Sequence, residues 1–164
     1  MLADCLNLGC GPNVLTPLAY VAGVPCASIW NCDWTAFPGV QLVCDVRTLD
    51  LPAGAFKVIR AHEFLEHFEQ YDGRRIVANC LNWLTPGGVI ELKVPDVQAL
   101  AECYISPAHP DTASDFIGRL YAHGDHRWGF TADTLRNLLE VSGFRQVEVE
   151  RRLFVRDMVA TGRR

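Results

Sequence analysis

The sequence lacks long apolar runs, closely spaced cysteine pairs and an excess of basic residues. No apolar stretch reaches the roughly 18 residues that cross a membrane, so we expect no membrane span. Residues 1–4 lack the basic and apolar regions of a signal peptide, because an acid stands at position 4. The seven cysteines are odd in number and irregularly spaced. That pattern is typical of free thiols in a reducing compartment, and we expect a cytoplasmic protein.

The charge balance is mildly acidic, with a formal net charge of −4, which argues against a surface that coats nucleic acid. Residues 145–164 are a local exception, with six arginines and three acids. They are interpreted as a solvated edge or, alternatively, as a docking patch. The length of 164 residues and the hydrophobic content of 49% predict one domain, 1–164, with its own core.

The most informative stretch is 6–13, where an apolar strand runs into Gly9 and Gly11. Such a bend lets bare backbone approach a ligand, which a Cβ would obstruct. Asp33 ends the next apolar stretch, 22 residues after Gly11, and Asp45 ends the one after that. A glycine bend with an acid about 20 residues on is typical of nucleoside binding, the acid holding the ribose hydroxyls.

Strand-like and helix-like periodicities alternate along the chain, which predicts an α/β fold with a largely parallel sheet covered on both faces. Residues 96–130 are irregular and are interpreted as an insertion near a site. The predicted strands are 2–8, 27–32, 40–44, 56–61 and 89–94, the predicted helices are 14–22, 71–84 and one capped by Thr131, and 147–150 with 153–161 form a terminal antiparallel pair.

These residues resemble the class I S-adenosylmethionine-dependent methyltransferases, especially those acting on small molecules. The resemblance covers essentially the whole chain. It implies a Rossmann-like, doubly wound, seven-stranded sheet that is mostly parallel with an antiparallel C-terminal strand, and helices on both faces. Residues 96–130 would lie on the substrate side. The matching stretches are 6–11, Asp33, Asp45-Val46, 61–67 with Leu65-Glu66-His67, 84–92 with Pro86-Gly87-Gly88, and the ending from Phe130 to Phe144.

The resemblance also implies the cofactor, S-adenosyl-L-methionine, and its product, S-adenosyl-L-homocysteine. The backbone of Gly9 to Gly11 would lie against the methionine portion. Asp33 would accept from the ribose hydroxyls, and Asp45 with the Val46 N–H would hold the adenine. The implied cofactor-binding residues are Asn7, Gly9, Cys10, Gly11, Asp33, Trp34, Asp45, Val46, Ala61, His62 and His67, with Trp34 flanking the adenine and Ala61 and His62 nearest the reacting methyl.

Each of these roles has a structural alternative. Asp33 would instead be a surface acid that ends a strand, and Trp34 a packing aromatic. Asp45 would cap a turn at 46–48. The side chains of Glu66 and His67 would orient a turn through hydrogen bonds.

Three histidines are candidate catalytic residues: His62 beside the methyl group, and His123 and His126 in a polar cluster at 123–128. Imidazole titrates near neutral pH, so His123 or His126 would act as a general base or recognise the acceptor. The alternative is a solvated loop with Trp128 and Phe130 packed inward. No metal is predicted: no further ligand lies at close spacing to His62 and His67, and a site at 123–126 is not favoured.

Two departures from the family pattern affect the predicted pocket. Asn7 stands where an acid is usual, and the first strand begins almost at Met1, where most relatives first carry helices that cover the cofactor. We expect either a more open pocket or a cover supplied by a partner subunit, such as the second chain of a homodimer.

Three other functions compete with small-molecule methylation. A nicotinamide-dependent oxidoreductase needs a third glycine where Val14 stands. Nucleic-acid methylation is disfavoured because Ala61-His62-Glu63-Phe64 stands where amino-methylating nucleic-acid enzymes carry an Asn/Asp-Pro-Pro-aromatic motif. A catalytically idle S-adenosylmethionine binder that regulates or completes a partner is retained as the second hypothesis.

Overall fold

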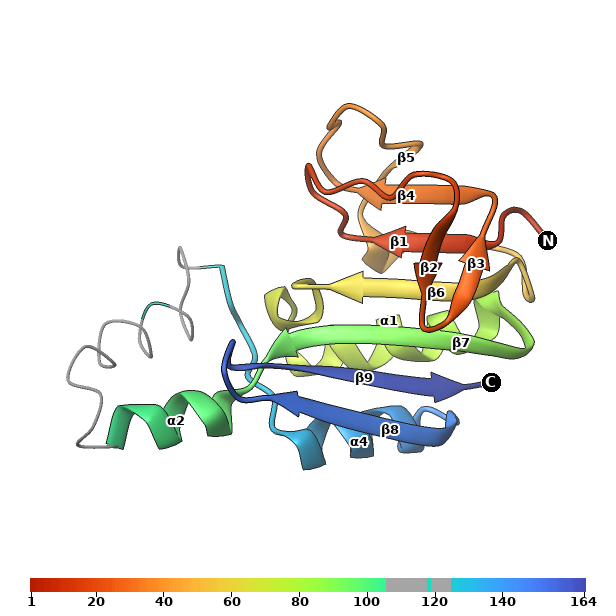
Figure 1. Cartoon of the computed structure of the whole chain (residues 1–164). Coiled ribbons are helices and arrows are strands. Elements are labelled where there is room, and N and C mark those ends of the chain that lie inside the picture. Colours follow the sequence, from red (N-terminus) through yellow and green to blue (C-terminus); the bar gives the residue numbers. More distant parts are fainter. Residues whose placement is uncertain (106–117, 119–124) are drawn as a thin grey trace.

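The computed structural model describes residues 1–105, 118 and 125–164, and Figure 1 shows a twisted central sheet. Its strands lie in the order β5-β4-β1-β6-β7-β9-β8. β9 is antiparallel to β7 and β8, and the other neighbouring pairs are parallel. The predicted seven-stranded, mostly parallel sheet is confirmed. The bounds are β1 Cys5–Leu8, β4 Ile29–Asp33, β5 Leu42–Val43, β6 Phe56–His62, β7 Leu84–Pro95, β8 Arg145–Arg152 and β9 Asp157–Arg163.

Two helices, α1 (Gln70–Trp83) and α4 (Ala132–Val141), pack on one face of this sheet and enclose the main core. α4 begins at Thr131, whose side chain accepts from the Thr134 N–H in a capping box, so the predicted cap is confirmed. The buried face of α1 repeats at helical spacing, as the sequence predicts. Its buried residues are Gly73, Ile76, Val77, Cys80 and Trp83.

The helix predicted at 14–22 is wrong, because the chain there forms a β-hairpin of β2 (Ala19–Val21) and β3 (Val24–Cys26). Pro17 interrupts any helix, and Leu18 (φ +76°) adopts the left-handed conformation. Figure 1 shows the hairpin on the sheet face opposite α1. There Val21 and Cys26 bury against Cys5, Val58 and Val89. The connection from β1 to β4 therefore contains a β-hairpin in place of the predicted helix.

The parallel register brings the predicted site residues to one edge of the sheet. Leu8 lies beside Cys32 of β4 and Ala61 of β6. The residues that follow, Gly9, Asp33 and His62, therefore emerge together at the carboxyl ends of β1, β4 and β6. This is the edge where ligands bind in open α/β sheets.

The remaining elements refine the predicted boundaries. The third predicted strand shrinks to β5, and the strand predicted at 89–94 lies inside β7. Two short 3₁₀ helices, η1 (Val46–Thr48) and η2 (Leu65–His67), follow β5 and β6. The region 96–130 contributes α2 (Val97–Ile105), and its residues 106–117 and 119–124 lie outside the described part.

All seven cysteines are free, as predicted, and five of them are buried. Burial raises the pKa of the Cys80 thiol to about 12, which makes it an inert core residue. A search of the helices in the described part of the chain found none that is long and apolar enough to cross a membrane.

An acid-sensitive contact joins the start of β1 to its neighbours. The carboxylate of Asp4 pairs with Lys57 Nζ at 2.8 Å and accepts from the N–H groups of Ala27 and Ser28. The Lys57 ammonium, followed by the Ser28 N–H, lowers the pKa of Asp4 from 3.8 to about 2. A carboxylate with a depressed folded-state pKa contributes stability above its unfolded pKa, and this contribution is lost as the pH falls toward 2.

We therefore expect Asp4→Asn to have a lower free energy of unfolding than wild type at neutral pH. The difference between the two proteins should disappear between pH 4 and pH 2. Urea unfolding across that range checks the prediction. Asp50→Asn, at an exposed position, is the matched control and should show no such change. A difference between wild type and Asp4→Asn that stays constant with pH would contradict the assignment.

Candidate functional site

The predicted glycine bend is present at the end of β1. Gly9 and Gly11 have φ values of +60° and +52°, a region that glycine occupies without the Cβ penalty of other residues. Between them, the Cys10 N–H donates to the Cys32 carbonyl at 3.2 Å, which fastens the bend to the end of β4. The Asn13 N–H then closes a turn on the Cys10 carbonyl at 3.0 Å. The bend therefore has a fixed conformation beside the carboxyl end of β4.

Asp33 lies directly against this bend. Its Oδ2 accepts from the Gly11 N–H at 2.9 Å, and its Oδ1 accepts from the Thr35 N–H at 2.9 Å. The residue is only 8% exposed, so it is not a surface acid. The two motifs that the sequence analysis paired across 22 residues are in contact, and the carboxylate retains lone pairs for further donors.

Trp34 follows Asp33 and is 80% exposed. The alternative, that it is a packing aromatic of the core, therefore does not hold. A large exposed aromatic beside a buried carboxylate offers a face on which a planar ligand can stack.

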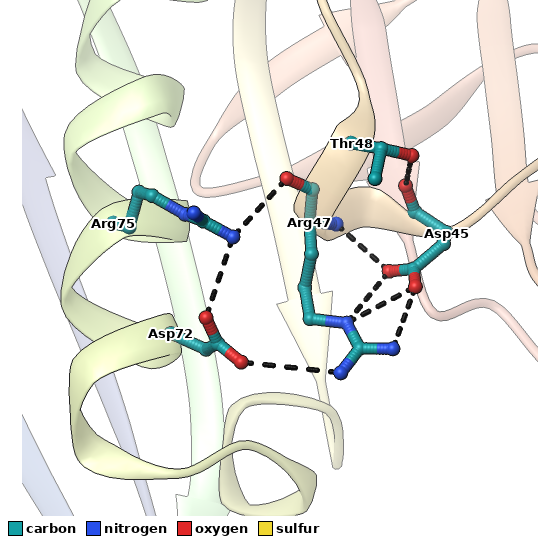
Figure 2. A network of polar contacts seen from close by, with 5 residues as sticks. All are labelled: Asp45, Arg47, Thr48, Asp72 and Arg75. Carbon is teal, nitrogen blue, oxygen red and sulfur yellow. Dashed lines mark hydrogen bonds and ion pairs between the residues drawn. The ribbon is translucent and has the colours of Figure 1, made fainter.

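Asp45 adopts the capping role that was the alternative to adenine binding. It is the N-cap of η1, and Figure 2 shows its carboxylate accepting from both the backbone N–H and the guanidinium of Arg47. This Arg47 contact lowers the pKa of Asp45. Arg47 also reaches Asp72 of α1, which pairs with Arg75. The carboxylate is therefore already satisfied by Arg47, and the Val46 side chain is buried in the main core.

Phe64 covers the glycine bend, a contact that the sequence analysis missed. A Cβ built on Gly9 would lie 2.0 Å from Cδ2 of the Phe64 ring, so the ring occupies the space that any side chain at position 9 would need. Phe64 also packs edge-to-face on Phe68, with ring centroids 4.9 Å apart. No short-range spacing signals this contact, because Phe64 comes from the turn after β6.

A row of polar side chains crosses the hairpin face of the sheet. Asn7 of β1 donates from Nδ2 to Asn31 Oδ1 at 2.9 Å and accepts at Oδ1 from Arg60 Nη1 at 3.2 Å. Arg60 Nη2 lies 2.8 Å from His62 Nδ1, and His62 Nε2 lies 2.8 Å from Glu91 Oε1. Asn7 thus replaces the usual acid with a group that can both donate and accept, and its amide is committed to the sheet.

The row also fixes the state of His62. An arginine can only donate, so Nδ1 of His62 accepts and Nε2 carries the proton toward Glu91. Burial acts to raise the pKa of Glu91, but the hydrogen bond from His62 Nε2, together with the Ala22 N–H and the Arg60 charge, outweighs it and lowers that pKa. Glu91 Oε2 also accepts from the Ala22 N–H at 2.9 Å and so holds the hairpin. Neither ring nitrogen of His62 is left to act as a general base.

Glu66 and His67 in η2 meet the segment that follows the undescribed residues. The Glu66 carbonyl accepts from the N–H groups of Arg127 and Trp128 at 2.8 and 3.1 Å. The rings of His67 and His126 are edge-to-face with centroids 4.9 Å apart. The structural alternative was that both side chains orient the turn through hydrogen bonds. His67 does so, because its Nδ1 lies 3.4 Å from the Asp125 carbonyl. The Glu66 carboxylate does not, because neither of its oxygens has a hydrogen-bond partner among the described residues.

The remaining predicted site residues that the structure describes lie in the core or line a cavity. Ala61 is buried in the main core under the bend, and Phe130 is buried while Trp128 is 38% exposed. Trp128 and Phe130 line a cavity of about 130 Å³ between η2, α1 and α4. His123 lies outside the described residues, so among the described candidates only His62 and His126 can be placed.

The comparisons with known proteins agree with this geometry. The family model described as "Methyltransferase domain" matches residues 2–149. Among curated protein sequences, no match was found.

Solved structures match over nearly the whole chain at low identity. An S-adenosylmethionine-dependent methyltransferase from Archaeoglobus fulgidus has a TM-score of 0.69 and 16% identity, with 99% of this chain and 86% of that chain covered. The 1,6-didemethyltoxoflavin-N1-methyltransferase of Burkholderia thailandensis, with bound 1,6-didemethyltoxoflavin and S-adenosylhomocysteine, has a TM-score of 0.66 and 17% identity, with 99% and 71% covered. A Haloferax volcanii protein in complex with the Trm112 methyltransferase activator has a TM-score of 0.66 and 14% identity, with 99% and 82% covered. The chain belongs to the methyltransferase-domain family and has the class I fold of the S-adenosylmethionine-dependent methyltransferases.

Proposed function

We propose that this protein transfers the methyl group of S-adenosylmethionine to a small-molecule acceptor by in-line displacement. The acceptor's lone pair forms the new bond to the methyl carbon while the carbon–sulfur bond breaks and sulfur keeps its electron pair. The observation that carries the proposal is the contact of the Asp33 carboxylate with the glycine bend. A bare backbone and an adjacent carboxylate are what an adenosine with an attached amino acid requires.

The described residues suggest how the cofactor is held. The backbone of Gly9 to Gly11 would lie against the methionine portion, and Asp33 would accept from the ribose hydroxyls. Trp34 would stack on the adenine, and its exposure supports this role. For Asp45 to reach the adenine, Arg47 would have to release part of the carboxylate, so we expect Val46 to contribute more through its N–H.

The acceptor side is assigned to 96–130 and to the histidines at its end. A methyl on a positive sulfur is already activated, so alignment of the two reactants supplies most of the rate, about 7–11 kcal/mol. A base is needed only where the acceptor loses a proton, and His123 would accept it, because the His126 ring packs against His67. The net charge of −4 favours a small acceptor over nucleic acid, and the seven free thiols support a reducing, cytoplasmic location.

The proposal is tested by titration calorimetry with S-adenosylhomocysteine. We expect one site per chain, with binding weakened about 5- to 150-fold in Trp34→Ala, because a stacked base contributes about 1–3 kcal/mol. Trp34 is exposed, so its removal should leave the melting temperature unchanged. Tyr71→Ala, which removes another exposed aromatic, is the matched control. Absence of binding at millimolar ligand would refute the proposal.

The second candidate is a cofactor-binding protein that acts through a partner subunit or as a homodimer. The Haloferax volcanii relative in complex with an activator favours it, as does the β8–β9 turn, where Phe154 is 97% exposed between Leu153 and Val155. Tight S-adenosylhomocysteine binding without turnover on a panel of acceptors, together with a stable complex in light scattering, would select this candidate.

A further inference from the structure

Three side chains with metal-binding atoms meet at the carboxyl end of β6, although they are distant in sequence. Glu66 and His67 belong to η2, and His126 lies 59 residues after His67. One potential ligand atom of each lies within 4.8 Å of those of the other two. Sequence spacing could not group them, because the segment that carries His126 returns only through the tertiary fold.

The backbone holds this grouping in place. The N–H groups of Arg127 and Trp128 both donate to the Glu66 carbonyl, so the residues next to His126 are fastened to η2. His67 Nδ1 is also within 3.4 Å of the Asp125 carbonyl. The donor atoms are therefore presented by two fixed stretches of backbone, as a binding site with a low ordering cost requires.

The Glu66 side chain supplies an independent reason to expect a cation. It is 1% exposed, and neither carboxylate oxygen has a hydrogen-bond partner among the described residues. Lys93, the nearby ammonium, is held by Glu63 at 2.7 Å and by Asp157 at 3.4 Å. A buried carboxylate without a donor is strongly disfavoured unless a cation or a proton compensates its charge.

We propose that Glu66, His67 and His126 bind one divalent transition-metal ion of borderline softness, with zinc as the reference ion. Two imidazoles and one carboxylate are a donor set typical of zinc, and three protein ligands leave one of four tetrahedral positions open. The ion would join η2 to the segment that follows the undescribed residues. This proposal does not depend on the proposed methyl transfer, because metal binding is measured without cofactor or acceptor.

The test uses the full chain after removal of metals by a chelator, titrated with Zn²⁺ in a calorimeter and with Co²⁺ in a spectrophotometer. We expect one ion per chain, a tetrahedral Co²⁺ visible spectrum without thiolate-to-metal charge transfer, and a rise in melting temperature with Zn²⁺. Glu66→Gln and His126→Ala should each weaken metal binding by about 100-fold. Loss of a residue that only orients a metal ligand typically weakens metal binding by about 10- to 100-fold, and loss of a ligand itself should cost at least as much. Glu140→Gln, at an exposed position, is the matched control.

Two further readouts keep the test decisive. Without metal, Glu66→Gln should melt close to wild type, because the amide keeps the shape of the side chain, and it should lose the Zn²⁺-induced rise. This combination also distinguishes loss of a ligand from loss of the fold. Failure of wild type to bind either ion, equal binding by the variants, or a cobalt spectrum with thiolate ligands from the free cysteines would each overturn the proposal.

Discussion

Asp33→Ala should weaken S-adenosylhomocysteine binding by at least about 100-fold while the protein stays folded. A carboxylate that accepts from two ribose hydroxyls makes two charge-assisted hydrogen bonds, each contributing about 1.5–3 kcal/mol. Loss of one of them alone corresponds to roughly a tenfold or larger change in dissociation constant. The substitution also removes the acceptor for the Gly11 N–H, so the bend that supports the ligand is released.

The measurement is calorimetric titration of wild type, Asp33→Ala and Asp33→Asn, with circular dichroism to verify folding. Asn keeps one acceptor oxygen, so it should lose less affinity than Ala. Asp50→Ala removes an exposed acid with no contact to the bend and should bind as wild type does. An Asp33→Ala protein that is folded and binds within threefold of wild type would show that the carboxylate does not hold the ribose.

Gly9→Ala should be the most destabilising single change at the bend. The position has φ +60°, which costs a non-glycine residue about 1–2 kcal/mol, and its new Cβ would lie 2.0 Å from the Phe64 ring. Forcing an aromatic ring out of a packed site adds about 1–3 kcal/mol. We expect a total loss of about 2–5 kcal/mol in the free energy of unfolding, measured by urea denaturation.

Gly11→Ala is the matched control, because the neighbouring glycine shares the left-handed conformation but has no atom within 4 Å of its Cβ position. It should lose only the conformational part, about 1–2 kcal/mol. Comparing Gly9→Ala in wild type and in Phe64→Ala isolates the steric part, which should largely disappear in the double mutant. Equal losses for Gly9→Ala and Gly11→Ala would show that the ring moves aside at no cost.

The elements whose pattern is local were predicted well. Ile76, Val77 and Cys80 repeat at helical spacing and form the buried face of α1, and Thr131 caps α4 as its position before an apolar helix predicts. The exception was 14–22, where apolar residues suggested a helix that Pro17 interrupts, and a hairpin formed to cover Cys5 and Val58. Periodicity reports which face is apolar but not what packs against it.

The sequence by itself determined the sheet, the glycine bend and its pairing with Asp33, because strand order and spacing bring them to one edge. Only the tertiary structure decided which side chains meet across long separations. Phe64 over Gly9, the engagement of Asp45 by Arg47, and the meeting of Glu66 and His67 with His126 are contacts of this kind. Their partners are selected by chain crossovers and by packing, and neither leaves a fixed spacing along the chain.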